Sequence, residues 1–272
     1  MPDTLTRFLN RFGAWLIPLG IVAGWYLTRA LLLSESQRLV LPVPHEIIRQ
    51  SILEPDIRND LLSGFQTTLI TTLVGLAISI VVGVALALAM SQARWLETGL
   101  FPPLIITQTI PILAITPLLG ALFGFDIRAR IIVVVIISIF PIITSTLFGL
   151  QNVAGDLHDQ FSLHAASRWT RLKLLQIPSG LPSFFNGLRT AAGFAVTGAV
   201  VGEMLLRGGA DRGLGSYMYI YYARGRYEEM WAALMVASLL GIAMFFIVRA
   251  IERKVTGNWT SIAATHGPRA QT

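Results

Sequence analysis

Long apolar runs separated by short polar segments dominate this chain. Residues 61–93, 98–125 and 131–155 contain no charged side chain, and residues 230–248 form a further uncharged run. A helix needs about 20 apolar residues to cross the hydrocarbon core of a bilayer. The pattern therefore predicts an all-α polytopic membrane protein. Its six transmembrane helices are expected near residues 12–33, 64–90, 101–123, 131–150, 184–206 and 229–250.

Two of these segments need a further argument. The first run follows Arg7 and Arg11, as the core of a signal peptide would, but it is longer than such a core and lacks an A-x-A cleavage site. We interpret it as a retained membrane anchor. The fifth segment is uncharged only between Arg189 and Glu203. It becomes long enough to span a bilayer if both charges lie near the interfaces.

Prolines are frequent in the middle of the chain. The third expected span carries Pro102, Pro103, Pro111 and Pro117, and the fourth carries Pro141. Proline inside a soluble helix costs about 3 kcal/mol, whereas membrane helices tolerate it where neighbouring groups satisfy the freed backbone. We therefore expect kinked helices that line a cavity or pack within a bundle.

Small residues recur at helical spacing along the fifth expected span. Ala191, Ala195, Gly198 and Gly202 fall on one narrow face. Small side chains let helices in a membrane approach closely. Two interpretations stay open: close packing within one bundle, or an interface between subunits.

The longest polar interruption, residues 156–183, separates the fourth and fifth spans. Asp156 is expected to cap a helix over residues 157–164, with Asp159 at its third position, and Ser167 to cap a second helix. The second helix would carry an apolar stripe of Trp169, Leu172 and Leu175, and Pro178 and Pro182 would end it. A helical hairpin with such a stripe favours docking of a partner. Packing against the chain's own helix ends is the alternative.

The composition agrees with a membrane protein and excludes other classes. Hydrophobic residues make up 54% of the 272 residues and charged residues only 13%, whereas soluble domains average about 25% charged residues. The net charge of +6 comes from basic residues spread singly along the chain, so no nucleic-acid partner is expected. The absence of cysteine excludes disulfides, thiolate metal sites and cysteine nucleophiles.

Motifs for catalysis or for metal and nucleotide binding are missing from the sequence. Neither Lys173 nor Lys254 lies in a GxxxxGK[ST] loop, so this chain is not expected to hydrolyse nucleotide by that route. The four histidines lack the spacing of metal ligands. Gly213 and Gly215 are not followed by the third glycine of a dinucleotide-binding loop, so a turn is favoured there.

A set of short motifs runs in order along nearly the whole chain. They are Leu41-Pro-Val-Pro44, Ile110-Pro111, Pro117-Leu118, Phe123-Gly124-Phe125, Phe140-Pro141, Gly149-Leu150, the segment 165–169, Ile177-Pro178, Leu181-Pro182, Gly187-Leu-Arg189, the segment 198–203, Gly213-Leu-Gly215, and Ile251-Glu252-Arg253 followed by Trp259. Together they resemble the permease subunits of type I ABC importers. Within that family they are similar to the branch that serves sulfonates, taurine, nitrate and thiamine-precursor pyrimidines.

The same family carries a loop written E-A-A-x3-G-x9-I-x-L-P. Its spacing matches Asp159, Ala165 and Ile177-Pro178, although Asp replaces Glu and Ala165 replaces Gly. Glycine at this position suggests a left-handed turn, where alanine costs about 1 kcal/mol. The resemblance implies that this loop couples the permease to an ATPase. Its candidate residues are Asp159, Ala165, Ala166, Ser167, Arg168, Trp169, Leu172 and Pro178.

The resemblance implies a type I ABC importer transmembrane fold and a path for a small polar solute. The implied partners are a second permease chain, expected as a homodimer, two cytosolic ABC ATPase subunits, an extracytoplasmic substrate-binding protein and membrane lipid. ATP and magnesium would be bound by the ATPase, and the chain itself would hold no cofactor, no metal and no catalytic residue.

Orientation and domain division also follow from the resemblance. The charges leave the orientation open, with 11 Lys/Arg residues inside and 10 outside. Residues 1–60 would form an N-terminal tail, first span and extracytoplasmic segment, residues 61–250 the ABC type-1 transmembrane domain with its cytosolic loop 151–183, and residues 251–272 a cytosolic tail. The protein would lie in the bacterial inner membrane with both termini cytosolic.

Candidate residues of a translocation path are Gln108, Arg189 and Glu203. Glu203 follows Arg189 by 14 residues, so the two lie about 21 Å apart along a helix and close to one face. The alternative function is a secondary transporter or channel. Such proteins often carry internal repeats and intramembrane carboxylates, but this chain has no evident repeat. Apart from Glu229, the first residue of the sixth expected span, Glu203 is the only acidic residue within an expected span.

Overall fold

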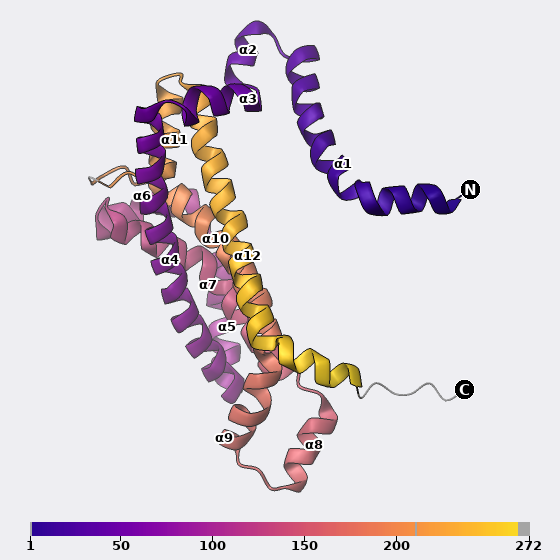
Figure 1. The fold of residues 1–272 in the computed structure, drawn as a ribbon. Helices are drawn as coiled ribbons and strands as arrows, with labels where there is room; N and C mark the ends of the chain where they lie inside the picture. Colours follow the sequence, from indigo (N-terminus) through magenta and orange to yellow (C-terminus); the bar gives the residue numbers. More distant parts are fainter. Residues whose placement is uncertain (1, 210, 266–272) are drawn as a thin grey trace.

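The structure, a computed structural model, describes residues 2–209 and 211–265, and its regular elements there are all helical (Figure 1). In chain order they are α1 (Pro2–Leu31), α2 (Glu35–Val40), α3 (Pro44–Ile47), α4 (Pro55–Gln92), α5 (Arg94–Thr109), α6 (Ile112–Phe123), α7 (Ile127–Gln151), α8 (Gly155–Leu163), α9 (Arg168–Arg171), α10 (Ile177–Leu205), α11 (Leu214–Ala223) and α12 (Tyr227–Thr265), with π-helical segments η1 (Ile48–Ile52) and η2 (Leu172–Gln176). The end of the expected C-terminal tail, residues 266–272, lies outside the described residues.

Helices α7 and α10 form the centre of a bundle that α4 and α12 cover (Figure 1). The two central helices run antiparallel, because Gly149 of α7 meets Gly180 near one end and Arg130 meets Gly202 near the other. The largest cluster of buried apolar residues joins all four helices, with Leu76, Val134, Ala195 and Leu240 among its members.

The small residues of α10 make this close packing possible. Ala191 and Ala195 are fully buried. A Cβ atom added at Gly198 would lie 3.1 Å from the Cα atom of Val134, so a larger residue would push α7 away. The small-residue face therefore packs against α7 of the same chain, as the first of the two interpretations predicted.

Three described helices, α4, α7 and α12, are long and apolar enough to cross a membrane, and the bent pair α5–α6 makes a fourth if it is counted as one span. The expected spans at residues 12–33 and 184–206 correspond to α1 and α10, which are not among them. The count of six spans therefore stays a prediction. Large apolar side chains such as Val81 and Leu239 are exposed on the outer faces of α4 and α12, as lipid contact requires.

The third expected span is not one kinked helix. Helices α5 and α6 meet at an angle of 101°, and the break falls at Ile110 and Pro111, which lie outside both helices. Proline lacks the N–H that would continue α5, and it restricts the residue before it to extended conformations. Ile110 accordingly has φ −67° and ψ 125°. The interior prolines Pro102, Pro103 and Pro117 stay within helices.

Candidate functional site

Helices α8 and α9 project as an elbow beyond the end of the bundle, between α7 and α10 (Figure 1). We use "elbow" for residues 155–176. Helix α8 begins at Gly155 after Ala154, so Asp156 lies inside its first turn and does not cap it. This corrects the expected cap. An acidic side chain in the first turn still stabilises the helix, because it lies near the positive end of the helix dipole.

The predicted cap of the second helix is confirmed. The hydroxyl Oγ of Ser167 accepts a hydrogen bond from the backbone N–H of Thr170 at 3.2 Å. Arg171 braces the same turn, because its Nε donates to the carbonyl oxygen of Ala166 at 3.2 Å. These bonds fix the angle at which the chain enters α9.

Ala165 adopts the left-handed conformation that its alignment with a glycine predicted. Its φ is 48°, and it is the one non-glycine residue with a positive φ in the described ranges. The N–H of Ala165 bonds to the Ser162 carbonyl and that of Ala166 to the Phe161 carbonyl, the pattern in which glycine usually ends a helix. Alanine in this position costs about 1 kcal/mol, so the tip of the elbow is strained.

Pro178 and Pro182 do not end the second helix, contrary to the prediction. The chain passes from α9 through the π-helical segment η2 directly into α10, which contains both prolines. A proline has no N–H for the carbonyl four residues before it and its ring crowds that carbonyl. The wider π-helical turn directly before Pro178 accommodates this mismatch.

The expected apolar stripe of the second helix divides between two environments. Leu172 and Leu175 are buried at the base of the elbow, as the packing alternative proposed. Trp169 is 71% exposed and Leu163 is 85% exposed. A shallow groove of about 370 Å³ lies between α8 and α9, lined by Gln160, Phe161, His164, Ala166 and Thr170. The other loop candidates, Asp159, Ala165, Ser167 and Arg168, are exposed on the elbow, and Pro178 is half-buried at its base.

The three candidates for a translocation path lie apart. Gln108 is exposed just before the break between α5 and α6. Arg189 is tied to α12, since its Nε lies 3.5 Å from a carboxylate oxygen of Glu252. Glu203 has no exposed surface. A side chain without exposed surface does not line a solute path in this conformation, so we do not retain Glu203 as a path residue.

Glu203 instead joins three helices. Its Oε2 accepts hydrogen bonds from the Thr68 hydroxyl at 2.9 Å and from the Gly215 N–H at 3.0 Å. The Thr68 hydroxyl oxygen in turn accepts a bond from the Leu214 N–H at 2.9 Å. Gly213 is therefore the N-cap of α11 and not part of an isolated turn. The carboxylate and the hydroxyl satisfy N–H groups that a helix start leaves free.

Arg130 is a buried group that sequence reasoning missed. Its guanidinium donates to the Leu206 carbonyl at 2.8 and 3.1 Å, to the Gly208 carbonyl at 3.0 Å and to the Asp211 carbonyl at 2.7 Å. Its side chain thereby holds the segment between α10 and α11 against α7. The only signal in the sequence was an arginine directly before a long apolar run.

Comparison with known proteins identifies the class to which this helical bundle with its projecting elbow belongs. The sequence model of the binding-protein-dependent transport system inner membrane component matches residues 75–257. The chain is 34% identical over 217 residues to the formylaminopyrimidine transport permease protein ThiX of Halalkalibacterium halodurans, covering 79% of this chain and 84% of that protein. It is 28% identical over 170 residues to the nitrate import permease protein NrtB of Synechococcus elongatus, covering 61% and 60%.

The fold is also similar to a solved structure of an importer. A chain from the MetNI methionine ABC transporter in inward-facing conformations matches 82% of this chain and 100% of its own length, with a TM-score of 0.55 and 17% identity. At this identity the match shows the fold alone, and it confirms the predicted fold class. The count of six spans is not part of that confirmation.

The chain belongs to the family of inner-membrane components of binding-protein-dependent transport systems. It is the transmembrane permease subunit of an ABC importer, an integral protein of the inner membrane that works with ATPase and binding-protein partners. The resemblance stated from the sequence motifs, including the branch with pyrimidine and nitrate permeases, is thereby confirmed.

Proposed function

We propose that this permease couples solute import to ATP hydrolysis through its elbow, which docks onto a cytosolic ATPase subunit. The observation that carries the proposal is Trp169, an aromatic residue that is 71% exposed on a braced part of the chain outside the bundle. Buried aromatic residues are the commonest anchors of protein interfaces. An exposed tryptophan held at a fixed position is suited to fill a pocket on a partner.

The elbow is rigid enough to transmit a push. Ser167 and Arg171 fix the turn into α9 through hydrogen bonds, and the helical path then continues through η2 into α10. A displacement of Trp169 therefore acts on the central helix of the bundle through about two continuous turns of helix. Arg168, also exposed, adds a charged donor beside the tryptophan.

The finer assignments belong to this proposal. The solute is small and polar, the permease forms a homodimer, and both termini lie in the cytosol. The partner ATPase binds ATP and magnesium, and this chain binds neither and hydrolyses no nucleotide. Residues 1–60, 61–250 and 251–272 act as N-terminal segment, transmembrane domain and cytosolic tail. The sequence has no GxxxxGK[ST] loop, which supports the assignment of ATP binding and hydrolysis to the partner ATPase.

The cytosolic position of the elbow predicts the side from which it can be labelled. The native chain has no cysteine, so Ser167→Cys introduces a single thiol, and Ser167 is exposed. We expect a membrane-impermeant maleimide to label this thiol in inside-out vesicles and to leave it unlabelled in intact cells. Labelling of intact cells would place the elbow outside and overturn the orientation.

The docking proposal predicts that Trp169→Ala weakens assembly. Truncation of an interface hot spot costs about 2 kcal/mol or more, so the Kd for the ATPase should rise about thirtyfold. Arg168→Ala should weaken binding less. The measurement is titration of purified ATPase onto the detergent-solubilised permease.

Tyr222→Ala is the matched control for Trp169→Ala. Tyr222 is also a large exposed aromatic residue, at 59% exposure, but it lies on α11, at the end of the bundle opposite the elbow (Figure 1). We expect it to leave ATPase affinity unchanged. Wild-type affinity of Trp169→Ala for the ATPase would show that the elbow is not the docking site.

A further inference from the structure

A row of polar side chains follows the exposed face of α10. Asn186, Thr190 and Thr197 are all exposed, and they recur at spacings of four and seven residues, which place them on one side of a helix. That side is opposite the buried residues Ala191 and Ala195, which pack inside the bundle. We call Asn186, Thr190 and Thr197 the polar face.

The polar face lies within the membrane-spanning part of the bundle. Helix α7 is long and apolar enough to cross a membrane, and α10 runs beside it, with Gly180 against Gly149 and Gly198 against Val134. All three residues of the polar face fall between positions 180 and 198. On α4 at the same depth, the exposed residues within 77–85 are all apolar, as lipid contact requires.

A groove of about 410 Å³ between α7 and α10 lies at the elbow end of the polar face, and Asn186 belongs to both. Four of its six lining residues carry a hydroxyl or an amide, so the groove is as polar as the face that it adjoins. The full lining is Thr144, Ser145, Phe148, Pro182, Ser183 and Asn186.

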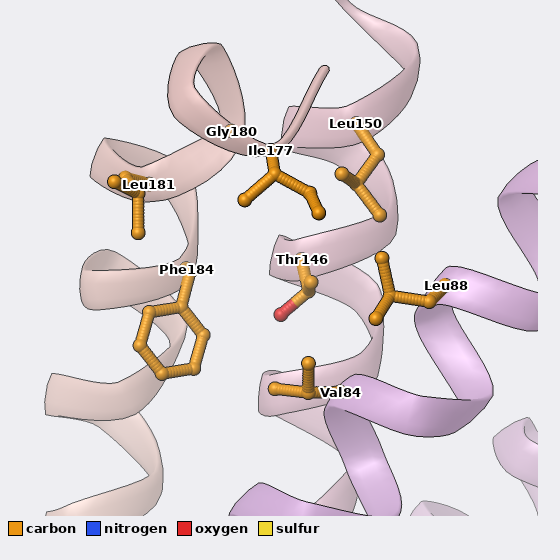
Figure 2. A pocket seen from close by; sticks show the side chains of 8 residues that line it. All are labelled: Val84, Leu88, Thr146, Leu150, Ile177, Gly180, Leu181 and Phe184. Carbon is orange, nitrogen blue, oxygen red and sulfur yellow. The ribbon is translucent and has the colours of Figure 1, made fainter. Parts of the chain in front are cut away.

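The opposite side of the same helix pair is apolar. Figure 2 shows Leu181 and Phe184 of α10 around one small cavity with Val84 and Leu88 of α4. Seven of the eight residues that line this cavity are apolar or glycine. Helix α10 therefore has an apolar side that packs toward α4 and a polar side that the described part of the chain leaves exposed.

The polar groups of the face and the groove differ in how far the chain itself satisfies them. Thr190 and Thr197 donate to the carbonyl oxygens four residues earlier, at 3.3 and 3.2 Å. The hydroxyls of Ser145 and Ser183 and the Nδ2 of Asn186 form no hydrogen bond with any residue that the structure describes. A polar group that faces hydrocarbon without a partner costs free energy, so these groups call for water or a polar molecule beside them.

We propose that the polar face and the adjoining groove form one wall of the water-filled path along which this permease passes its solute. The inference rests on the proposed function in import and assigns the path to α10 and α7. The amide of Asn186 and the hydroxyls of Ser145 and Ser183 suit a solute with several hydrogen-bonding groups. Arg189 adds no unpaired charge to this wall, because its Nε lies 3.5 Å from a carboxylate oxygen of Glu252.

Thiol accessibility tests what the polar face contacts. The native chain has no cysteine, so Asn186→Cys, Thr190→Cys and Thr197→Cys each introduce a single thiol. The probe is an anionic methanethiosulfonate, added with ATP and magnesium to the permease and its partner subunits in lipid nanodiscs, where it reaches both sides of the membrane. It reacts with the thiolate, which forms in water and hardly at all in hydrocarbon. Intact-mass spectrometry gives the rate of labelling.

Ile247→Cys and Ile242→Cys on α12 are the matched controls. They are 52% and 53% exposed, and Gly241 lies beside Val196 of α10, so both controls lie at the depth of the polar face. We expect the thiols of the polar face to react at least about tenfold faster than these two.

Reaction of the three thiols at the control rate overturns the proposal, because the polar face then contacts lipid. Slow reaction together with disulfide-linked permease dimers on oxidation also overturns it, because a second copy of the chain then covers the face. Each position is tested separately, so a variant that does not assemble leaves the other two to decide. Failure of elbow docking is distinguishable, since it appears as wild-type ATPase affinity of Trp169→Ala and does not change the labelling rates.

Discussion

Arg130→Ala is expected to lower the stability of the folded permease by about 4 kcal/mol, because it removes four hydrogen bonds from a charged donor and leaves the buried carbonyl of Leu206 without a partner. Arg130 is 2% exposed as a residue, and its guanidinium donates to the carbonyls of Leu206, Gly208 and Asp211. For a chain of this size the loss corresponds to a fall of about 8–16 °C in apparent unfolding temperature. The measurement is thermal unfolding in detergent, followed by tryptophan fluorescence.

One further variant separates charge from hydrogen-bond geometry at this site, and another serves as a control. Arg130→Lys keeps the positive charge but replaces the planar fork with a compact ammonium, so it should recover only part of the loss. Arg128→Ala removes an exposed arginine two positions earlier on the same helix and should unfold like the wild type. If Arg130→Ala and Arg128→Ala unfold at the same temperature, Arg130 does not hold the segment between α10 and α11.

Local features of this chain could be predicted from the sequence because their partners lie a few residues away. Ser167 caps α9 through a bond to Thr170, three residues on. Ala165 is left-handed because the turn after α8 requires it. The small residues of α10 predicted a close contact with another helix, because in a membrane small side chains allow two helix backbones to approach each other closely. The first two features shape the elbow, and the third brings α7 and α10 together at the centre of the bundle.

Features that depend on distant partners could not be predicted. Arg130 and Leu206 are 76 positions apart, and Glu203 and Thr68 are 135 positions apart. Glu203, near the edge of an expected span, was therefore interpreted as a residue of the translocation path. In the structure it is buried and accepts hydrogen bonds from Thr68 and Gly215. Pro178 was expected to end a helix because the sequence does not reveal the π-helical turn that accommodates it.

Gly213→Ala is expected to be among the most damaging single changes in the chain. The φ of Gly213 is −90°, which any residue can adopt, so the requirement here is space. A Cβ atom at this position would overlap the carboxylate of Glu203, which Thr68 and Gly215 hold in place. Overpacking and the displaced hydrogen bonds together should cost about 3 kcal/mol. Apparent unfolding temperature should fall by about 6–12 °C.

A double-mutant cycle with Glu203→Ala tests the stated cause of this loss. Removing the carboxylate leaves Thr68 and Gly215 without an acceptor, so Glu203→Ala alone destabilises the chain. It also creates room for the new Cβ atom, so Gly213→Ala should cost at least about 1 kcal/mol less in that background. Gly193→Ala is the control, because Gly193 lies on α10 with nothing within 4 Å of an added Cβ. It should be neutral or slightly stabilising, since alanine favours helices. Strict additivity of the Gly213→Ala and Glu203→Ala costs would mean that the carboxylate is not what excludes a side chain at position 213.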